Sequence, residues 1–435
     1  MDILIMAGQL ILSLSILVGL HELGHLLTAK MFGMRVEKYY IGFPPKIIGR
    51  KWGETEYALG AIPLGGFVKI TGMVDESLDT AMLKNKPEPY EFRAKPAWQR
   101  LIVMMGGIVV NIITGIFIFI LLFYLYGETY IPAGHRIVAG KYAQEIGLQT
   151  GDKILKINGE SYTRFNELVG SAVFLSSNAY YTVERNGKIF DVKIPANLIE
   201  KLSDRKNRAT FIEPALPFKI GKVIPKQPAA IAGIKKGDRI LAIDNNTITY
   251  FYELEKVLEN NKEKLVKIKI QRGNKELLKE AVISKEGKLG FYPDFSENYQ
   301  RQDFSLLTSI SKGSVEAFNV LYDNIRGFGK IFRGELSADK ALSGPIDIAA
   351  RVFGAEWDWF RFWRITAVLS IILAFMNFLP IPALDGGHVM FLTYEIISGR
   401  KPSDKFLERA QMVGMVLLLS LMVFVIVNDI LKNIF

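Results

Sequence analysis

The chain has 435 residues, of which 49% are hydrophobic, and it carries a formal net charge of +10. This length allows several domains, and the absence of cysteine excludes disulfides and thiolate metal sites. The basic charge would suit nucleic acid, but much of it flanks apolar segments, which assigns it to membrane flanks and soluble surfaces and predicts no nucleic-acid partner.

Four apolar stretches are long enough to cross a bilayer, which needs about 20 residues. They are Ile3–Ala29, Leu101–Tyr126, Ile365–Leu384 and Ala410–Asn428. The N-terminus is unlike a secretory signal peptide, because Asp2 stands where a basic residue belongs and no small-residue cleavage site follows. The sequence therefore predicts a multi-pass α-helical membrane protein with four transmembrane helices in a lipid bilayer.

Basic residues between the spans predict how the chain is oriented. Residues 30–100 contain twelve Lys and Arg, and the short connection before the fourth span contains Arg400, Lys401, Lys405 and Arg409. The positive-inside rule puts both connections in the cytoplasm. The two termini and the 127–363 insert then lie outside.

The first span ends in a motif with metal-ligand spacing, His21-Glu22-Leu23-Gly24-His25. Residues four apart share one face of a helix, so His21 and His25 can hold one Zn²⁺ ion. Glu22 is then placed to act as the general base, and the alternative is that it only orients an imidazole. Ionisable groups in an apolar span are costly and usually functional.

Residues 32–97 alternate short apolar strands with Gly and Pro, and a polar loop follows at 75–90. This pattern predicts a small β element beside the membrane. Its segment Gly65-Gly66-Phe67-Val68 reads as a turn leading into a strand. We expect that strand to offer an edge to which a substrate segment can pair.

The insert contains a repeat with an offset of 86 residues. Gly147-Leu148-Gln149-Thr150-Gly151-Asp152 returns as Gly233-Ile234-Lys235-Lys236-Gly237-Asp238. These Gly-Asp turns resemble PDZ domains, which bind peptides by strand addition or by capture of a terminal carboxylate. The resemblance implies two inserted α/β PDZ-like domains that bind peptide termini. Two unrelated small β domains remain the alternative.

A second cluster of unusual residues closes the third span, from Asn377 to His388. Pro380 and Pro382 break the helix, and Asp385 is a carboxylate at membrane depth that needs a partner. His21, His25 and Asp385 together would leave one tetrahedral position open, which is the pattern of a catalytic zinc site. On its own, Asp385 could equally be a turn residue at the end of a span.

In chain order, the predicted parts are the first span with the histidine motif (1–31), the cytoplasmic-side β element and loop (32–97), the second span (98–126), the PDZ-like domains (127–215 and 216–300), amphipathic or peripheral helices (301–363), the third span with Leu-Asp-Gly-Gly (364–390), and a cytoplasmic connection with the fourth span (391–435).

The histidine motif, the later Leu384-Asp385-Gly386 and the tandem PDZ-like domains resemble the site-2 protease family of intramembrane zinc metalloproteases, of the RseP type, over essentially the whole chain. The resemblance implies one Zn²⁺ per chain and a bacterial cytoplasmic (inner) membrane location. It also implies substrates that are pre-cleaved single-span membrane proteins, such as an anti-sigma factor or a remnant signal peptide. By the same resemblance, Asn377 holds substrate.

Asn111 has two interpretations. With Gly107 it matches the Gly-Pro-x-x-Asn of the family's second span, although Ile108 replaces the proline. It either helps Asn377 to bind the freed substrate backbone or hydrogen-bonds between spans.

Three other functions are alternatives to proteolysis. A catalytically inactive PDZ-type membrane receptor is disfavoured by the intact histidine motif and Asp385. A zinc transporter would be expected to carry several ligand sets or an inverted repeat, and only one ligand set is evident. A tethered soluble peptidase would not carry its ligands inside the spans.

Overall fold

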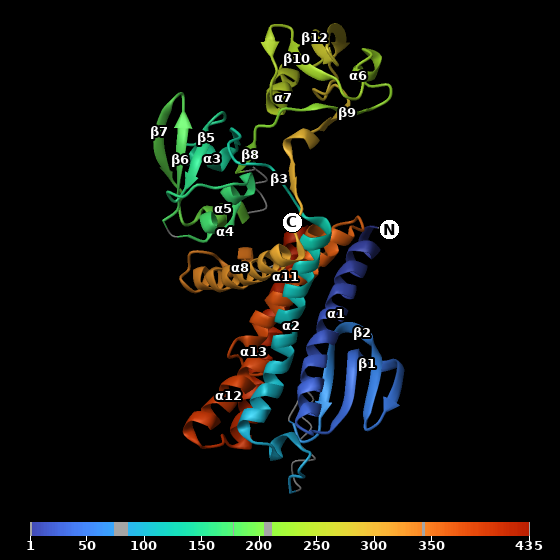
Figure 1. The fold of residues 1–435 in the computed structure, drawn as a ribbon, viewed down its shortest axis with the longest axis vertical. Coiled ribbons are helices and arrows are strands. Elements are labelled where there is room, and N and C mark those ends of the chain that lie inside the picture. Colours follow the sequence, from blue (N-terminus) through green and yellow to red (C-terminus); the bar gives the residue numbers. More distant parts are fainter. Residues whose placement is uncertain (1, 74–85, 177, 204–210, 342–343, 435) are drawn as a thin grey trace. The chain divides into compact units, whose positions relative to one another are not determined.

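The computed structural model describes residues 2–73, 86–176, 178–203, 211–341 and 344–434, and its contacts separate two units (Figure 1). The first unit comprises Met1–Gly127, Asp303–Phe332 and Ser337–Phe435. The second comprises Glu128–Gln302 with Arg333–Leu336. The polar loop predicted at 75–90 lies largely outside the described residues.

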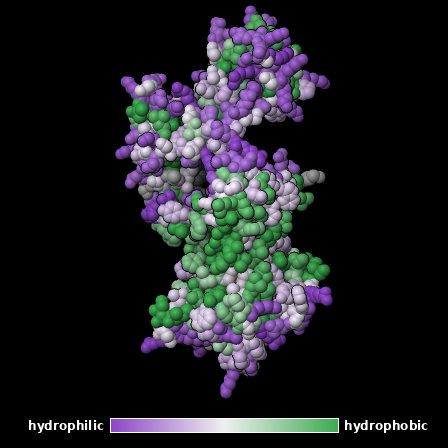
Figure 2. Space-filling model, in the orientation of Figure 1, coloured by the Kyte–Doolittle hydropathy of each residue, from purple (hydrophilic) through white to green (hydrophobic). Residues whose placement is uncertain are grey.

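The first unit contains four helices that are long and apolar enough to cross a membrane. They are α1 (Asp2–Met31), α2 (Ala97–Tyr126), α11 (Trp359–Phe378) and, within α13 (Asp404–Ile434), the segment Lys405–Leu431. Hydrophobic side chains cover the surface of this unit where the helices run (Figure 2). The four predicted spans are confirmed, and the chain is a multi-pass membrane protein.

The third span ends six residues earlier than its apolar stretch. α11 stops at Phe378, and a separate helix that was not predicted, α12 (Asp385–Ser398), begins at Asp385. Pro380 and Pro382 cannot continue α11, and Ala383 has a φ of 79°, so the chain turns between the two helices. A Cβ at Gly386 would lie 2.1 Å from the Leu379 carbonyl oxygen, which explains the glycine.

Close contacts between backbones lock α1 to α2. A Cβ at Gly24 would lie 2.3 Å from the carbonyl oxygen of Gly106, and one at Gly106 would lie 2.6 Å from that of Gly24. An ion pair then joins α2 to α12, with Nη2 of Arg100 2.6 Å from Oε1 of Glu395 and both side chains largely buried. The helices that carry the histidine motif and Asp385 are therefore both fixed against α2.

The region 301–363, predicted to hold amphipathic or peripheral helices, contains α8 (Leu306–Phe332), which packs on α2 and α11. At Gly313 its backbone comes close to that of Ile120. Shorter elements complete this unit, namely η2 (Phe92–Ala94), α9 (Ala338–Ala341), α10 (Pro345–Asp347) and the π-helix η5 (Ile348–Phe353).

The predicted β element is a sheet made by two long strands, β1 (Val36–Trp52) and β2 (Thr55–Ile70), which pair with each other twice. The first half of β1, residues 36–41, pairs with residues 66–70 of β2 on one side and with residues 55–59 on the other. The second half of β1, residues 46–52, then pairs with the remaining side of residues 55–60. Residues 66–70 form an edge that lies against α1. There a Cβ at Gly66 would approach Val18 to 2.9 Å, and the hydroxyl of Tyr39 donates to the Gly19 carbonyl at 2.7 Å.

The second unit contains two separate hydrophobic cores, one for each copy of the repeat. The first copy holds the sheet β5-β6-β7 and the second holds β11-β10-β12-β13, both antiparallel. The elements in chain order are β3 (Glu128–Tyr130), β4 (Ile137–Ala139), α3 (Lys141–Glu145), β5 (Lys153–Ile157), η3 (Phe165–Val169), α4 (Ser171–Phe174), β6 (Tyr180–Arg185), β7 (Lys188–Lys193), α5 (Leu198–Ser203), β8 (Ile212–Pro214), β9 (Lys219–Val223), α6 (Pro228–Ile231), β10 (Arg239–Ile243), β11 (Asn246–Thr247), α7 (Phe251–Glu259), β12 (Leu265–Arg272), β13 (Lys275–Val282), β14 (Phe291–Asp294), η4 (Ser296–Asn298) and β15 (Gln300–Gln302).

The two copies share one ion pair at equivalent positions. Asp152 and Asp238, each 1% exposed, end the repeated Gly-Asp turn. Arg185 donates to both carboxylate oxygens of Asp152 at 2.6 and 2.7 Å, and Arg272 does the same to Asp238 at 2.7 and 2.7 Å. In both copies the same arginine also donates to a glycine carbonyl of the turn. The sequence repeat is therefore also a repeat of local structure.

We predict that Asp238→Ala lowers the free energy of unfolding of the second copy by about 1–3 kcal/mol, because it removes the acceptor of Arg272 and of the Lys235 amide. Burial by itself would raise the pKa of Asp238, but the hydrogen bonds from Arg272 and the Lys235 amide outweigh it and lower the pKa below the usual value. The stabilisation is therefore present above the pKa of an unfolded aspartate and lost as the pH falls.

Hydrogen exchange of residues 216–300 in the full-length protein measures this effect. The control is Glu276→Ala, which removes an ion pair with Lys269 whose side chains are 59% and 48% exposed. Exchange should increase only in the Asp238 variant, and equal exchange in the two variants would contradict the role of the buried pair.

Candidate metal centre

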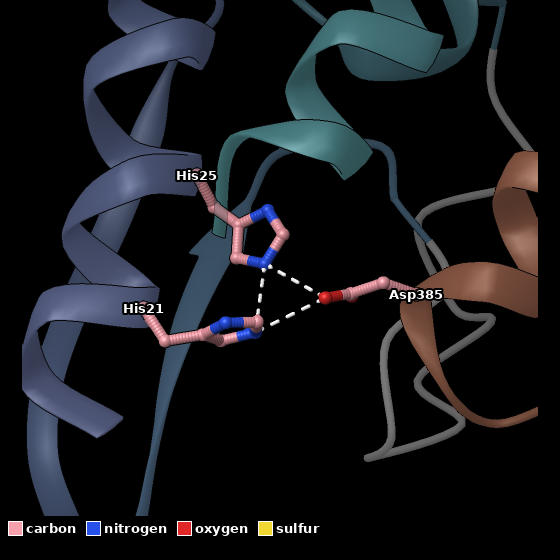
Figure 3. A group of neighbouring side chains, drawn as sticks. All are labelled: His21, His25 and Asp385. Atoms are coloured by element: carbon pink, nitrogen blue, oxygen red, sulfur yellow. Dashed lines mark hydrogen bonds and ion pairs between the residues drawn. The ribbon is translucent and has the colours of Figure 1, made fainter. Parts of the chain in front are cut away.

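Three side chains from distant parts of the chain converge between α1 and α12 (Figure 3). The Nε2 atoms of His21 and His25 lie 3.2 Å apart. Oδ2 of Asp385 lies 3.0 Å from the first and 3.3 Å from the second. The two histidines are one turn apart on α1, and Asp385 is the first residue of α12. The structure thus brings together the three residues that the sequence predicts as ligands.

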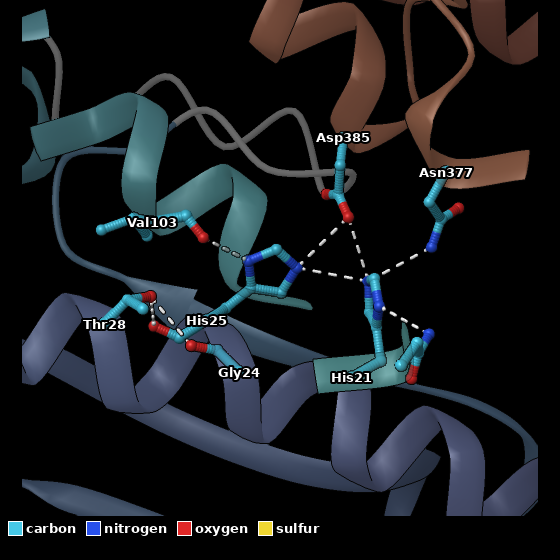
Figure 4. Close-up of polar contacts among 8 residues, drawn as sticks. His21, Gly24, His25, Thr28, Val103, Asn377 and Asp385 are labelled. Carbon is cyan, nitrogen blue, oxygen red and sulfur yellow. Dashed lines mark hydrogen bonds and ion pairs between the residues drawn. The ribbon is translucent and has the colours of Figure 1, made fainter. Parts of the chain in front are cut away.

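The surroundings of His25 fix which of its nitrogens faces the cluster. Nδ1 of His25 lies 2.8 Å from the carbonyl oxygen of Val103 on α2 (Figure 4). A carbonyl can only accept, so Nδ1 donates and Nε2 presents a lone pair to the centre. Oδ2 of Asp385 is buried and has no hydrogen-bond partner among the described residues. Three potential ligand atoms crowded together in this way are suited to hold a cation between them.

The spacing of the three atoms fits zinc. Ligands at about 2.0–2.2 Å from a tetrahedral Zn²⁺ ion lie roughly 3.3–3.6 Å from one another, and the observed separations of 3.0–3.3 Å come close to that range. Two imidazoles and one carboxylate are also a ligand set of catalytic zinc sites, in which the fourth position stays open. The residues present therefore suit one zinc ion per chain.

Glycine on α2 makes room for the imidazoles. A Cβ at Gly107 would lie 2.5 Å from Cε1 of His21 and 2.6 Å from Nε2 of His25, so any side chain at this position overlaps the two rings. The two histidine residues are 7% and 5% exposed. α2 therefore forms a close wall behind the ligands.

Glu22 lies beside the ligands, at the wall of a cavity of about 670 Å³. It points from α1 towards the sheet edge, where a Cβ at Gly66 would lie 3.5 Å from its Cγ and the backbone of Val68 faces its carboxylate. Its neighbours are thus the metal ligands on one side and the edge strand on the other.

Most of the residues predicted for the site line this one cavity. They are His21, Glu22, His25, Gly65, Gly66, Phe67, Val68, Asn377 and Asp385. The amide nitrogen of Asn377 lies 3.3 Å from Nε2 of His21 (Figure 4). Asn111 differs, since it is 0% exposed, is not part of the cavity lining and has its amide nitrogen 3.1 Å from Nδ1 of His21. Its predicted contact with substrate stays untested.

Sequence reasoning missed several contributors to the site. The carbonyl of Val103 is a backbone group and leaves no signal in the sequence. Gln411 and Met415 show that α13 also lines the cavity. Nε2 of His388 lies 2.9 Å from Nε2 of Gln411, so this imidazole is engaged by α13. The contact of α13 with the turn after α11 is tight, because a Cβ at Gly414 would overlap the Pro382 carbonyl.

The chain has four spanning helices, and the first of them carries a His-Glu-x-x-His motif whose histidines meet Asp385 in a zinc-type ligand set. These features together define a membrane metalloprotease. The chain belongs to peptidase family M50, whose model matches residues 9–421. It is a zinc metalloprotease of that family.

Known relatives match over nearly the full length of the chain. The regulator of sigma E protease of Haemophilus influenzae is 29% identical and is covered to 98%, as is this chain. A Xylella fastidiosa protein named "Putative zinc metalloprotease" is 28% identical over 99% of both chains. The regulator of sigma-E protease RseP of Salmonella typhimurium is 27% identical over 96% of this chain and 97% of its own. The predicted likeness to RseP-type proteases is confirmed.

We predict that the purified protein holds one zinc ion per chain and that Asp385→Ala weakens zinc binding by more than the roughly 10–100-fold typical of residues that only support a ligand. The substitution removes one of three ligands and leaves two imidazoles, which cannot balance the charge of the ion. Zinc content by elemental analysis and affinity by competition with a chelator measure it. The control is Ile397→Ala, which alters an 81% exposed side chain of the same helix away from the ligands; equal zinc loss in both variants would contradict ligation by Asp385.

Proposed function

We propose that the protein hydrolyses peptide bonds within or next to the transmembrane segments of single-span membrane proteins. The observation that carries the proposal is the position of the ligand set at the wall of a cavity formed by spanning helices and a sheet edge. Relatives named as regulator of sigma E proteases support it. Anti-sigma factors and remnant signal peptides are the substrate classes that suit this activity.

We infer that Glu22 is the general base and later the general acid. Zinc, when bound, supplies Lewis-acid activation of water and of the scissile carbonyl. The Glu22 carboxylate takes a proton from the attacking water and delivers it to the leaving amine, so it needs to face both the ligands and the substrate. Its place between His21 and the edge strand meets that requirement.

A helical substrate must be unwound before it can be cut, because its carbonyls are engaged in helix hydrogen bonds. Residues 66–70 pair with 36–41 on one side, and no strand pairs with their other side among the described residues. We propose that the substrate adds to this free edge through Gly65, Gly66, Phe67 and Val68. The Asn377 amide, which lines the same cavity, then binds a substrate backbone group.

The proposal also covers the orientation of the chain in the membrane and the way in which substrates are selected. The basic connections support a cytoplasmic active-site side, with both termini and the PDZ-like domains outside the bacterial inner membrane. The PDZ-like pair would then restrict access to substrates whose outer domain has already been cut, by binding newly made peptide termini.

Glu22→Gln should lower the rate of cleavage by about 10²–10⁴-fold, because an amide cannot accept the proton of water. The assay uses the full-length detergent-purified protein and a single-span substrate, supplied both with and without its outer domain. Wild type should cut only the trimmed form, and a chelator should stop the cleavage.

The zinc affinity of the Glu22→Gln variant serves as the control, and it should stay at the wild-type value. Normal cleavage by this variant would refute the role of Glu22. If wild type with bound zinc cuts neither form of any single-span substrate, the alternative of a catalytically inactive PDZ-type receptor is favoured instead.

Val68→Pro should lower cleavage by about tenfold or more, because proline removes an N–H group that faces the Glu22 carboxylate and lies on the edge offered to substrate. The matched control is Ile47→Pro on the opposite edge of the sheet, where Ile47 is 70% exposed and is skipped by the strand pairing. Zinc content should be unchanged in both variants. Equal rates for the two proline variants would contradict pairing of the substrate at the inner edge.

A further inference from the structure

Among the described residues, Asn111 is a buried polar side chain that contacts a metal ligand without lining the cavity. It lies in the middle of α2, is 0% exposed, and places its amide nitrogen 3.1 Å from Nδ1 of His21. Its amide oxygen is also buried and has no hydrogen-bond partner among the described residues. The hydroxyl of Ser370 on α11 donates to its backbone carbonyl at 2.7 Å, which holds this part of α2 in place.

Two orientations of the Asn111 amide occupy the same space, since its oxygen and nitrogen are close in size. With the nitrogen towards His21, the amide donates to Nδ1, and neutral His21 must carry its proton on Nε2. That proton would point at Nε2 of His25 and Oδ2 of Asp385, which lie 3.2 and 3.0 Å away. The atom that should face the metal would then have no free lone pair.

With the oxygen towards His21, the amide accepts from Nδ1. The proton of His21 then sits on Nδ1, and Nε2 presents its lone pair to the point shared with His25 and Asp385. In the orientation with the nitrogen towards His21, the amide oxygen has no partner among the described residues, so that orientation gains no second hydrogen bond. His25 already shows the same arrangement, because its Nδ1 donates to the Val103 carbonyl.

We propose that the side-chain oxygen of Asn111 accepts a hydrogen bond from Nδ1–H of His21 and so fixes the tautomer and the ring orientation that zinc requires. Asn111 is thereby a positioning residue and not a contact for substrate. The proposal rests on the zinc site of the proposed function, but it does not depend on proteolysis. The proposal requires only that the side chain at position 111 can accept a hydrogen bond.

The requirement can be tested by two substitutions at position 111, one that keeps the hydrogen-bond acceptor and one that removes it. Asn111→Asp keeps an acceptor and cannot donate, whereas Asn111→Leu keeps the approximate shape and can do neither. We expect Asn111→Leu to weaken zinc binding about 10–100-fold, and Asn111→Asp to hold zinc at least as tightly as wild type. Affinities are measured on full-length protein in detergent by competition with a chromophoric chelator. A loss of zinc affinity in Asn111→Asp, or wild-type affinity in Asn111→Leu, would overturn the proposal.

A matched control separates this effect from the loss of a buried amide. Gln9 on α1 is also 0% exposed and donates to the Gly354 carbonyl at 3.0 Å, away from the ligands. Gln9→Leu should leave zinc affinity unchanged, and a loss equal to that of Asn111→Leu would show that general packing is responsible.

A spectroscopic measurement on the wild type does not depend on any substitution at position 111. The chain has four histidines, so ¹⁵N labelling of their rings gives few signals. Zinc-loaded protein should show His21 protonated at Nδ1, with that signal assigned by its absence in His21→Ala. A signal that places the His21 proton on Nε2 would refute the proposal while leaving the peptidase activity itself untouched.

Discussion

Three potential zinc ligands lie within 3.3 Å of one another inside this protein, and keeping them together is the constraint on which the first unit depends. They stay together only if the segments that carry them cannot move apart. Glycine contacts between α1 and α2 hold the two imidazoles, and the ion pair between Arg100 and Glu395 holds α12 against α2. α2 is thus the common support of both ligand-bearing helices, although it contributes no ligand.

The same arrangement explains why hydrolysis can take place beside apolar helices. The cavity is bordered by ionisable groups on α1 and α12, by the edge strand and by residues of α13. Edge strands leave hydrogen-bonding groups unpaired, which is costly at membrane depth unless a substrate or water satisfies them. A free edge next to Glu22 is therefore unfavourable by itself, and binding of a substrate strand would offset that cost. The hydrogen bond from Tyr39 to α1 holds the sheet so that this edge stays beside the ligands.

Patterns that arise from local chemistry could be predicted from the sequence, and contacts made by the backbone could not. Apolar length gave the four spans, and the pairing of His21 with Asp385 followed from the need of a buried carboxylate for a partner. The helix at Asp385 was missed because its glycines and the preceding prolines read as a turn. The second pairing of β1 with β2 depends on where each long strand bends, and the carbonyl of Val103 has no side-chain signature at all.

α2 also shows how one helix face can serve a site without binding the ion. Val103, Gly107 and Asn111 are spaced four residues apart and so share a face of α2. In that order they provide a carbonyl acceptor for His25, a gap that admits both rings, and an amide next to His21. The two imidazoles lie one turn apart on α1, whereas their partners Val103 and Asn111 lie two turns apart on α2, with Gly107 between them. The partners therefore flank the gap that admits the rings, and under the tautomer proposed for His21 a residue without an acceptor at 111 would leave only His25 oriented.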